Sequence, residues 1–298
     1  MRRLRPVRTL LALGVIAGLS GLATPGSAMI EPGFPGGDAG ALQTGVIAIE
    51  QPNPSTWYSV TFAEAYDSAP IVVMGPVSEN GGQPAFMRVR NVTAAGFEYQ
   101  LEEWDYLDGY HLPITASWLA IGEGWHDFVG MTAFATTVEL DHTWSTIELG
   151  FDSTPVVFAQ VASVNDPAAA TIRVRNGSGT SVQLKLEEEE AADGVHGVET
   201  VHVIAMTEGS TTMDGLGVLV GRTGRVVEEA WHTESATSRG VTGLLATAQT
   251  HFGGDSMNLR YRNLSDDGFD VLVQEEQSAN SEVNHTTEDV GWMMISEW

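Results

Sequence analysis

The sequence predicts an all-β protein, and three observations support that prediction. Apolar and polar residues alternate over short runs, as in residues 56–63 and 85–91, which is the period of a half-buried strand. Gly, Asn, Asp and Pro separate these runs, and no stretch has the period of an amphipathic helix. One frame also recurs along the chain. We therefore expect three tandem antiparallel β-sandwich repeats of about six strands each, and a pseudo-trimer is one way in which they can pack.

The recurring frame is Arg-x-Arg-Asn, followed by a turn and an apolar strand. Its asparagines are Asn91, Asn176 and Asn263, which lie 85 and 87 residues apart. Each asparagine matches a glycosylation acceptor pattern, but its fixed place between two strands favours a turn residue. Gly45, Gly130 and Gly217 are taken as the first residues of the copies. The predicted sandwiches are therefore residues 45–129, 130–216 and 217–298.

The first residues have the pattern of a secretory signal. Four arginines precede the apolar run from Leu10 to Leu22, and small residues end at Ala28. The apolar run is short for a membrane span, so we expect a signal peptide over residues 1–28 and a secreted protein without a membrane span. Residues 29–44 are rich in Pro and Gly and are expected to form a flexible lead-in.

The chain is strongly acidic and has no cysteine. Residues 1–28 hold four of the 14 basic residues and none of the 39 acidic ones, so the remainder has a net charge of −29. Such a charge repels nucleic acid and anionic membranes, and it favours solubility at high salt or the attraction of divalent cations. Without disulfides, stability must come from the core, hydrogen bonds or bound ions.

The amino-acid sequence of the first copy resembles that of a known protein family. A Pro-led apolar strand, "RVRNVTAAGF", a Trp shortly afterwards and "SWLAIG" resemble the H-type lectin domain, most closely over residues 45–124. The resemblance implies a six-stranded antiparallel β-sandwich that assembles as trimers and binds sugars, often galactose or N-acetylgalactosamine. Three copies in one chain would then mimic the trimer of that family.

The arginine pairs and the first copy's aromatic loop are candidates for ligand binding. Residues i and i+2 of a strand share a face, so each pair projects to one side. Two interpretations stand: guanidinium groups that grip sugar hydroxyls or carboxylates, and cross-strand ion pairs with residues such as Glu98 and Glu102. The predicted ligand-binding residues are Arg88, Arg90, Trp104, Tyr106, Asp108 and His111, with Trp104 and Tyr106 expected to be exposed in a loop.

A second constellation is acidic. In each copy, the alternation along a strand places one glutamate on the same face as the apolar residues. These are Glu103, Glu188 and Glu275, and each is followed by a histidine. An inward carboxylate must be paired, hydrogen-bonded or metal-bound. Both a structural Glu–His cluster and a cation site, with calcium the candidate ion, fit this pattern. The first copy has Ile114 where the others have a second glutamate, so a full site is not expected there. The candidate metal ligands are Glu187, Glu188, Asp193, His196, Glu199, Glu275, His285 and Glu288.

These observations predict a secreted, non-enzymatic protein that binds glycans or a cell-surface polysaccharide. The sequence has no nucleophile elbow and no zinc-protease helix motif. The alternative is an extracellular structural or assembly scaffold whose repeats are stabilised by cations and which can self-associate.

Overall fold

All regular secondary structure in the described residues, 42–213 and 216–297 of the computed structural model, is β-strand. The all-β prediction is confirmed. The predicted signal peptide and residues 29–41 of the predicted lead-in lie outside the described residues. The lead-in prediction extends too far, because the first strand already begins at Gln43.

The strands fall into three successive groups, which we call the first repeat (residues 42–121), the second repeat (124–206) and the third repeat (209–297). Those of the first repeat are β1 (Gln43–Gln51), β2 (Tyr58–Thr61), β3 (Ile71–Ser78), β4 (Ala85–Thr93), β5 (Gly96–Glu103) and β6 (His111–Ile121). Those of the second are β7 (Gly124–Phe128), β8 (Met131–Leu140), β9 (Ser145–Glu148), β10 (Val156–Val161), β11 (Ala170–Arg175), β12 (Ser181–Glu188) and β13 (Glu199–Met206). Those of the third are β14 (Gly209–Met213), β15 (Leu216–Val227), β16 (His232–Ser235), β17 (Val241–Ala248), β18 (Met257–Ser265), β19 (Gly268–Glu275) and β20 (Glu288–Glu297).

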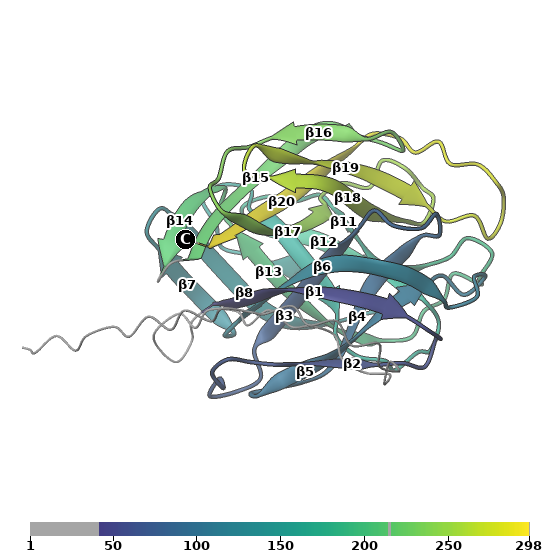
Figure 1. Ribbon diagram of the computed structural model, residues 1–298, viewed down its shortest axis with the longest axis horizontal. Helices are drawn as coiled ribbons and strands as arrows, with labels where there is room; N and C mark the ends of the chain where they lie inside the picture. The colour runs from purple at the N-terminus through teal and green to yellow at the C-terminus, as the bar shows by residue number, and fades with distance from the viewer. Residues whose placement is uncertain (1–41, 214–215, 298) are drawn as a thin grey trace, which may run out of the picture.

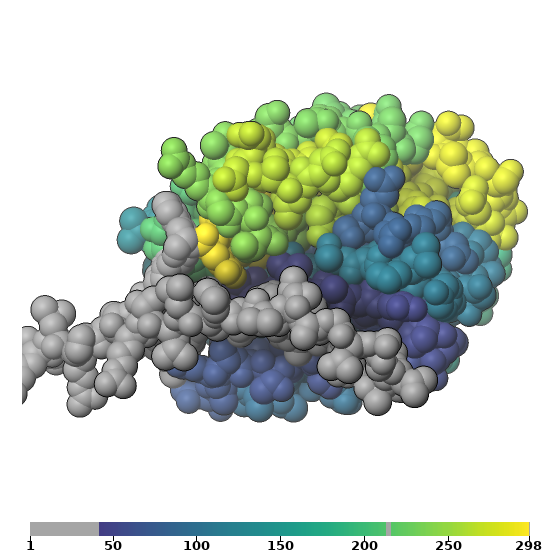
Figure 2. Space-filling view, viewed as in Figure 1, coloured from purple at the N-terminus to yellow at the C-terminus, as the bar shows by residue number. Residues whose placement is uncertain are grey.

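Each repeat contributes an inner and an outer group of antiparallel strands (Figure 1). The inner groups have the orders β1-β6-β3, β10-β13-β8-β7 and β14-β15-β20-β17. The outer groups have the orders β2-β5-β4, β11-β12-β9 and β18-β19-β16. A short parallel pairing of β3 with β18 joins the first repeat to the third, and Figure 2 shows these repeats packed directly against each other.

The apolar core has four parts. Three clusters each fill one repeat between its inner and outer strands. A fourth cluster draws on all three repeats, for example on Leu119, Phe158 and Met293, which are buried. The alternation along the strands therefore serves two cores, one within each repeat and one shared among them. Pseudo-trimer packing remains a prediction, and the shared cluster supports it.

The strand register corrects the alignment of the repeat openings. Gly45 pairs with Trp118, and the matching pair in the third repeat is Gly221 with Trp292. A Cβ on Gly45 would lie 2.8 Å from Trp118 Nε1, so this glycine makes room for the indole. Gly130 lies in the turn between β7 and β8, and Gly217 is the second residue of β15, so neither occupies the position that matches Gly45. The first strands of the second and third repeats, β7 and β14, therefore begin before Gly130 and Gly217.

Candidate functional site

The first arginine of each repeated pair is buried and reaches into another repeat. Arg88, on β4, is 1% exposed. Its guanidinium donates to the carbonyl oxygens of Asp166 and Ala168, both at 3.0 Å, in the second repeat. It also contacts Glu199 Oε1 at 2.9 Å and Glu102 Oε1, on its own repeat, at 3.2 Å. Arg88 thus fastens the first repeat to the second.

Arg173, on β11, makes the matching contacts to the third repeat. It donates to the carbonyl oxygens of Gly253 at 3.0 Å and Asp255 at 2.8 Å. Glu187 Oε2 lies 2.7 Å from its guanidinium, and Glu288 Oε1 lies 3.6 Å away. The contact between the second and third repeats therefore repeats the chemistry of the first contact.

Arg260, on β18, points from the third repeat into the first. It donates to the carbonyl oxygens of Ser78 at 2.9 Å, Asn80 at 3.1 Å and Gln83 at 3.0 Å. Its side-chain partner is the neutral amide of Gln274, at 3.2 Å. Burial lowers the pKa of Arg260 to about 10. The three arginines therefore connect first to second, second to third, and third to first, in a closed cycle.

Two of these contacts contain the Glu–His–Glu cluster that the spacing predicts. His196 Nδ1 lies 3.0 Å from Glu188 Oε1, and its Nε2 lies 3.7 Å from Glu199 Oε1. In the third repeat, His285 Nε2 lies 3.3 Å from Glu288 Oε1, and its Nδ1 contacts Glu275. The structure brings both triplets together, and all their side chains are buried.

The surroundings set the charges in these clusters. Burial disfavours the charged imidazole, but the nearby Glu199 carboxylate and the hydrogen bond to Glu188 outweigh it and raise the pKa of His196. The pKa of His285 is raised in the same way. Burial disfavours the Glu199 carboxylate, yet the nearby His196 and hydrogen bonds from Ser163 and from backbone N–H groups lower its pKa to about 2. In both clusters the surroundings therefore favour the protonated histidine and the ionised form of the second glutamate, Glu199 or Glu288.

The first repeat departs from this pattern, as the sequence predicts. His111 contacts the carbonyl oxygens of Leu112 at 2.9 Å and Gln83 at 3.2 Å. Ile114 belongs to the apolar core of the repeat. Burial lowers the pKa of His111, so its surroundings favour the neutral form, in contrast to those of His196 and His285.

The eight candidate metal ligands do not converge on one position. Asp193 is exposed and accepts a hydrogen bond from the Val195 N–H, and Glu187 pairs with Arg173 and Lys185. Two tighter sets have potential ligand atoms within 4.8 Å of one another: Asp166, Glu188 and His196, and Asp255, Glu275 and Glu282. Sequence reasoning missed Asp166 and Asp255 because they come from loops on the other side of each sandwich end. A role for calcium stays a prediction.

The predicted ligand-binding residues do not form one exposed site. Trp104 is 1% exposed and packs edge-on against Phe86, with ring centroids 5.0 Å apart. Its loop lies against the second repeat, since Asp105 accepts a hydrogen bond from the Ala169 N–H at 3.0 Å. The expectation that Trp104 is exposed is therefore wrong.

Arg88 and His111 are buried as well, which leaves three of the six candidates accessible. Asp108 and Tyr106 are exposed, and Arg90 is partly exposed. Sugar binding at these residues stays a prediction.

The second arginine of each pair stacks on a tryptophan of its own repeat. The guanidinium carbon lies 3.9 Å from the ring centroid for Arg90 over Trp57 and for Arg175 over Trp144. The third pair is Arg262 over Trp231, at 4.3 Å. The asparagine that follows has φ between 51° and 53° in all three repeats, the left-handed conformation in which asparagine is enriched. In each copy of the Arg-x-Arg-Asn sequence, the first arginine therefore makes a buried contact between repeats, the second stacks on a surface tryptophan, and the asparagine forms a turn.

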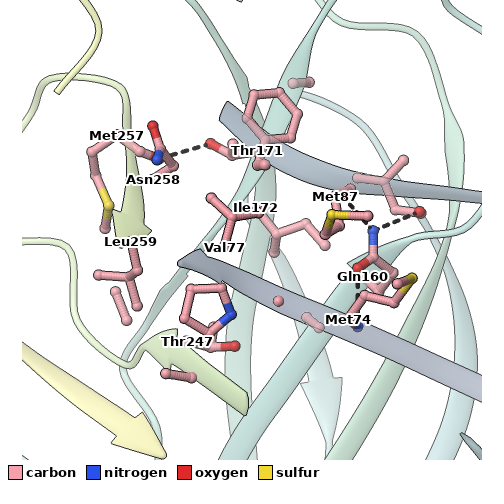
Figure 3. A pocket seen from close by; sticks show the side chains of 18 residues that line it. Met74, Val77, Met87, Gln160, Thr171, Ile172, Thr247, Met257, Asn258 and Leu259 are labelled. Atoms are coloured by element: carbon pink, nitrogen blue, oxygen red, sulfur yellow. Dashed lines mark hydrogen bonds between the residues drawn. The ribbon is translucent and has the colours of Figure 1, made fainter. Parts of the chain in front are cut away.

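A cavity of about 110 Å³ lies where the three repeats meet (Figure 3). Its walls come from β3, β4, β10, β11, β17 and β18, two strands from each repeat. Gln160 crosses one side, where its amide bonds the backbone of Met74 and Met87. Asn258 Oδ1 is buried without a hydrogen-bond partner. The lining includes no charged residue, so the cavity suits water or a small neutral molecule.

The fold and these contacts define an all-β protein of multiple sheets whose segments are held together by buried arginines. No protein-family model matches the chain. The chain is similar to Halomucin of Haloquadratum walsbyi, with 28% identity over 278 residues. That alignment covers 88% of this chain and 3% of Halomucin.

Proposed function

We propose that this chain is a non-catalytic structural module of the cell exterior, with its three repeats closed into one ring. The closed cycle of buried arginine contacts carries the proposal, because it is a stabilising device rather than a substrate site. Because of this cycle, each repeat is joined to both others by buried side-chain contacts as well as by the polypeptide chain.

The surface chemistry supports an exterior, high-salt setting. The net charge of −29 beyond residue 28 keeps the surface hydrated and opposes association. At about 1 M salt the screening length falls to roughly 3 Å, so exposed charges contribute little. The pairs of Arg88 and Arg173 lie inside the protein, where salt screens them far less.

The similarity to Halomucin supports a place at the cell surface. It covers most of this chain and a small part of Halomucin, so a module within a larger surface layer is the function we infer. In the described residues, no helix is long and apolar enough to cross a membrane.

Localisation and activity together test the proposal. The natural protein should be found outside intact cells by antibody labelling, should resist protease at both low and high salt, and should hydrolyse none of a panel of glycosides and esters. Retention inside the cell, or catalytic turnover abolished by substituting one residue, would overturn it.

Carbohydrate binding is the second function we propose, because Tyr106 and Asp108 are exposed on one loop of the first repeat. A glycan array with and without calcium tests it, with Tyr106→Ala as the variant. Absence of binding by the wild-type protein would remove this function and leave the structural one in place.

A further inference from the structure

The surface stack of the second repeat differs from the other two in its charge. Arg90 Nε pairs with Glu98 at 2.7 Å, and Arg262 Nε pairs with Asp270 at 3.1 Å. The residue directly opposite Arg175 on the neighbouring strand is Gln183, which accepts its Nε–H at 2.9 Å. Two guanidinium groups thus have a carboxylate of their own. Arg175 has a neutral amide in that place.

The geometry of Arg175 leaves its outer edge free. Its guanidinium lies 3.9 Å from the centroid of Trp144, and Gln183 takes up Nε and also bonds Asn176. In the residues that the structure describes, neither Nη atom of Arg175 has a hydrogen-bond partner. A guanidinium fixed by stacking, with both Nη donors free, is prepared for the two oxygens of a carboxylate.

A second cation lies at the same ring. Lys185, the only lysine of the chain, has its Nζ 5.2 Å from the Trp144 centroid. Two carboxylates lie on this face: Glu187, which pairs with Lys185 at 2.7 Å and is shared with the buried Arg173, and the exposed Glu148, opposite Ser181 on β9. Arg173 also lies 3.6 Å from Glu288, whereas Arg175 has no carboxylate within ion-pair distance in the described residues, so Arg175 is the uncompensated cation of this patch.

Aromatic surface continues beside the cations. The ring of His251 meets Trp144 edge-on, with centroids 5.2 Å apart, and the next residue, Phe252, is 52% exposed. Arg225 stacks on Phe252 at 3.8 Å. Rings next to fixed donors are the combination that binds the apolar faces and polar groups of a sugar together.

We propose that Arg175 and Lys185, supported by Trp144, bind the carboxylate of an acidic sugar residue. The net charge of −29 repels polyanions and a second copy of this chain at long range, so a single acidic group on a largely neutral saccharide is the favoured ligand. The cations lie on the outer strands of the second repeat, and His251 and Phe252 of the third repeat complete the aromatic surface.

The test titrates residues 29–298 with the methyl glycoside of galacturonic acid, whose carboxylate is free, and follows the indole N–H signal of Trp144 by NMR. Methyl galactoside, acetate, inorganic sulfate and a short glutamate peptide serve as comparison ligands. We expect saturable binding of the galacturonate, about tenfold tighter than that of any comparison ligand. Equal affinity for acetate or sulfate would reduce the site to a simple anion site, and tighter binding of the peptide would make it a protein-docking site. Either result overturns the proposal.

Reciprocal variants make the test specific. Arg175→Ala and Gln183→Glu should each weaken binding about tenfold, the second by supplying the internal carboxylate of the other repeats. Arg262→Ala, which removes a stacked arginine that already pairs with Asp270, is the matched control and should change affinity less than about twofold. Glu98→Gln should create a second site in the first repeat. Unchanged affinity in Arg175→Ala, or in Gln183→Glu with an unchanged fold, contradicts the assignment.

Discussion

The contact made by Arg88 and the contact made by Arg260 use the same buried cation in two different ways. Arg88 meets the ionised Glu199, and each charge compensates the burial of the other. Arg260 meets three carbonyl oxygens and no carboxylate within ion-pair distance in the described residues, so its contacts are with dipoles, and Glu79 acts on its charge only from a longer distance. The comparison teaches that backbone carbonyls suffice to hold a buried arginine, but that removing an arginine has a different effect where a carboxylate remains behind.

The largest effect is expected from Arg88→Met. The substitution leaves Glu199, which is fully buried, without its guanidinium. Breaking one partner of a buried ion pair costs about 3–5 kcal/mol, so the free energy of unfolding should fall by that amount in urea titrations. A loss below about 1 kcal/mol would show that Ser163 and His196 hold the carboxylate without help.

Arg260→Met should have a smaller effect than Arg88→Met. It leaves the carbonyl oxygens of Ser78, Asn80 and Gln83 without a donor but strands no charge. The expected loss is about 1–3 kcal/mol, measured in the same urea titrations. An effect equal to that of Arg88→Met would remove the distinction between charged and uncharged contacts.

Glu188→Ala separates the structural interpretation of the cluster from the metal interpretation. His196 Nδ1 loses its carboxylate partner, so we expect a loss of about 1–3 kcal/mol in the free energy of unfolding. Calcium should not change that loss if the cluster is structural. Calcium-dependent stabilisation of the wild-type protein, absent from the variant, would instead establish a cation site.

The stability should also fall as the pH rises above about 6.5. The pKa values of His196 and His285 are raised in the folded protein, so their contribution is complete below the unfolded value of about 6.5 and is lost through the folded pKa. Glu199, with its pKa lowered to about 2, contributes fully throughout this range. Thermal unfolding between pH 6 and 9 measures the trend.

The matched control for this pH dependence is the double variant His196→Asn, His285→Asn, in which the slope should be shallower. Some slope remains, because burial raises the pKa of Glu102 and of Glu103 to about 7, and such groups also lose stability as the pH rises. An unchanged slope in the double variant would show that the histidines do not titrate in this range.

The smallest effect is expected for the surface stack. Arg90→Ala removes the contact with Trp57 and the pair with Glu98, both partly exposed, and should cost about 0.5–1 kcal/mol. The effect should shrink at high salt, whereas that of Arg88→Met should persist. A stack that proves as important as the buried arginine would contradict this ranking.

Local patterns predicted the strands and the Glu–His–Glu triplets, because strand parity and short spacing fix which side chains share a face. The partners of Arg88 and the burial of Trp104 depend on how one repeat packs against another, which no local pattern records. The repeat openings were misplaced for a related reason. A glycine is a common residue, and only pairing with Trp118 or Trp292 distinguishes Gly45 and Gly221 from Gly130 and Gly217.

The closed cycle of arginine contacts has a genetic consequence. In an assembly of identical subunits, one substitution alters every equivalent interface at once, so all interfaces must tolerate it together. Here each contact is encoded separately, and a single substitution alters one of three. That independence is what permits Ile114 at a position where the other repeats keep a glutamate, and Gln183 where they keep an acid.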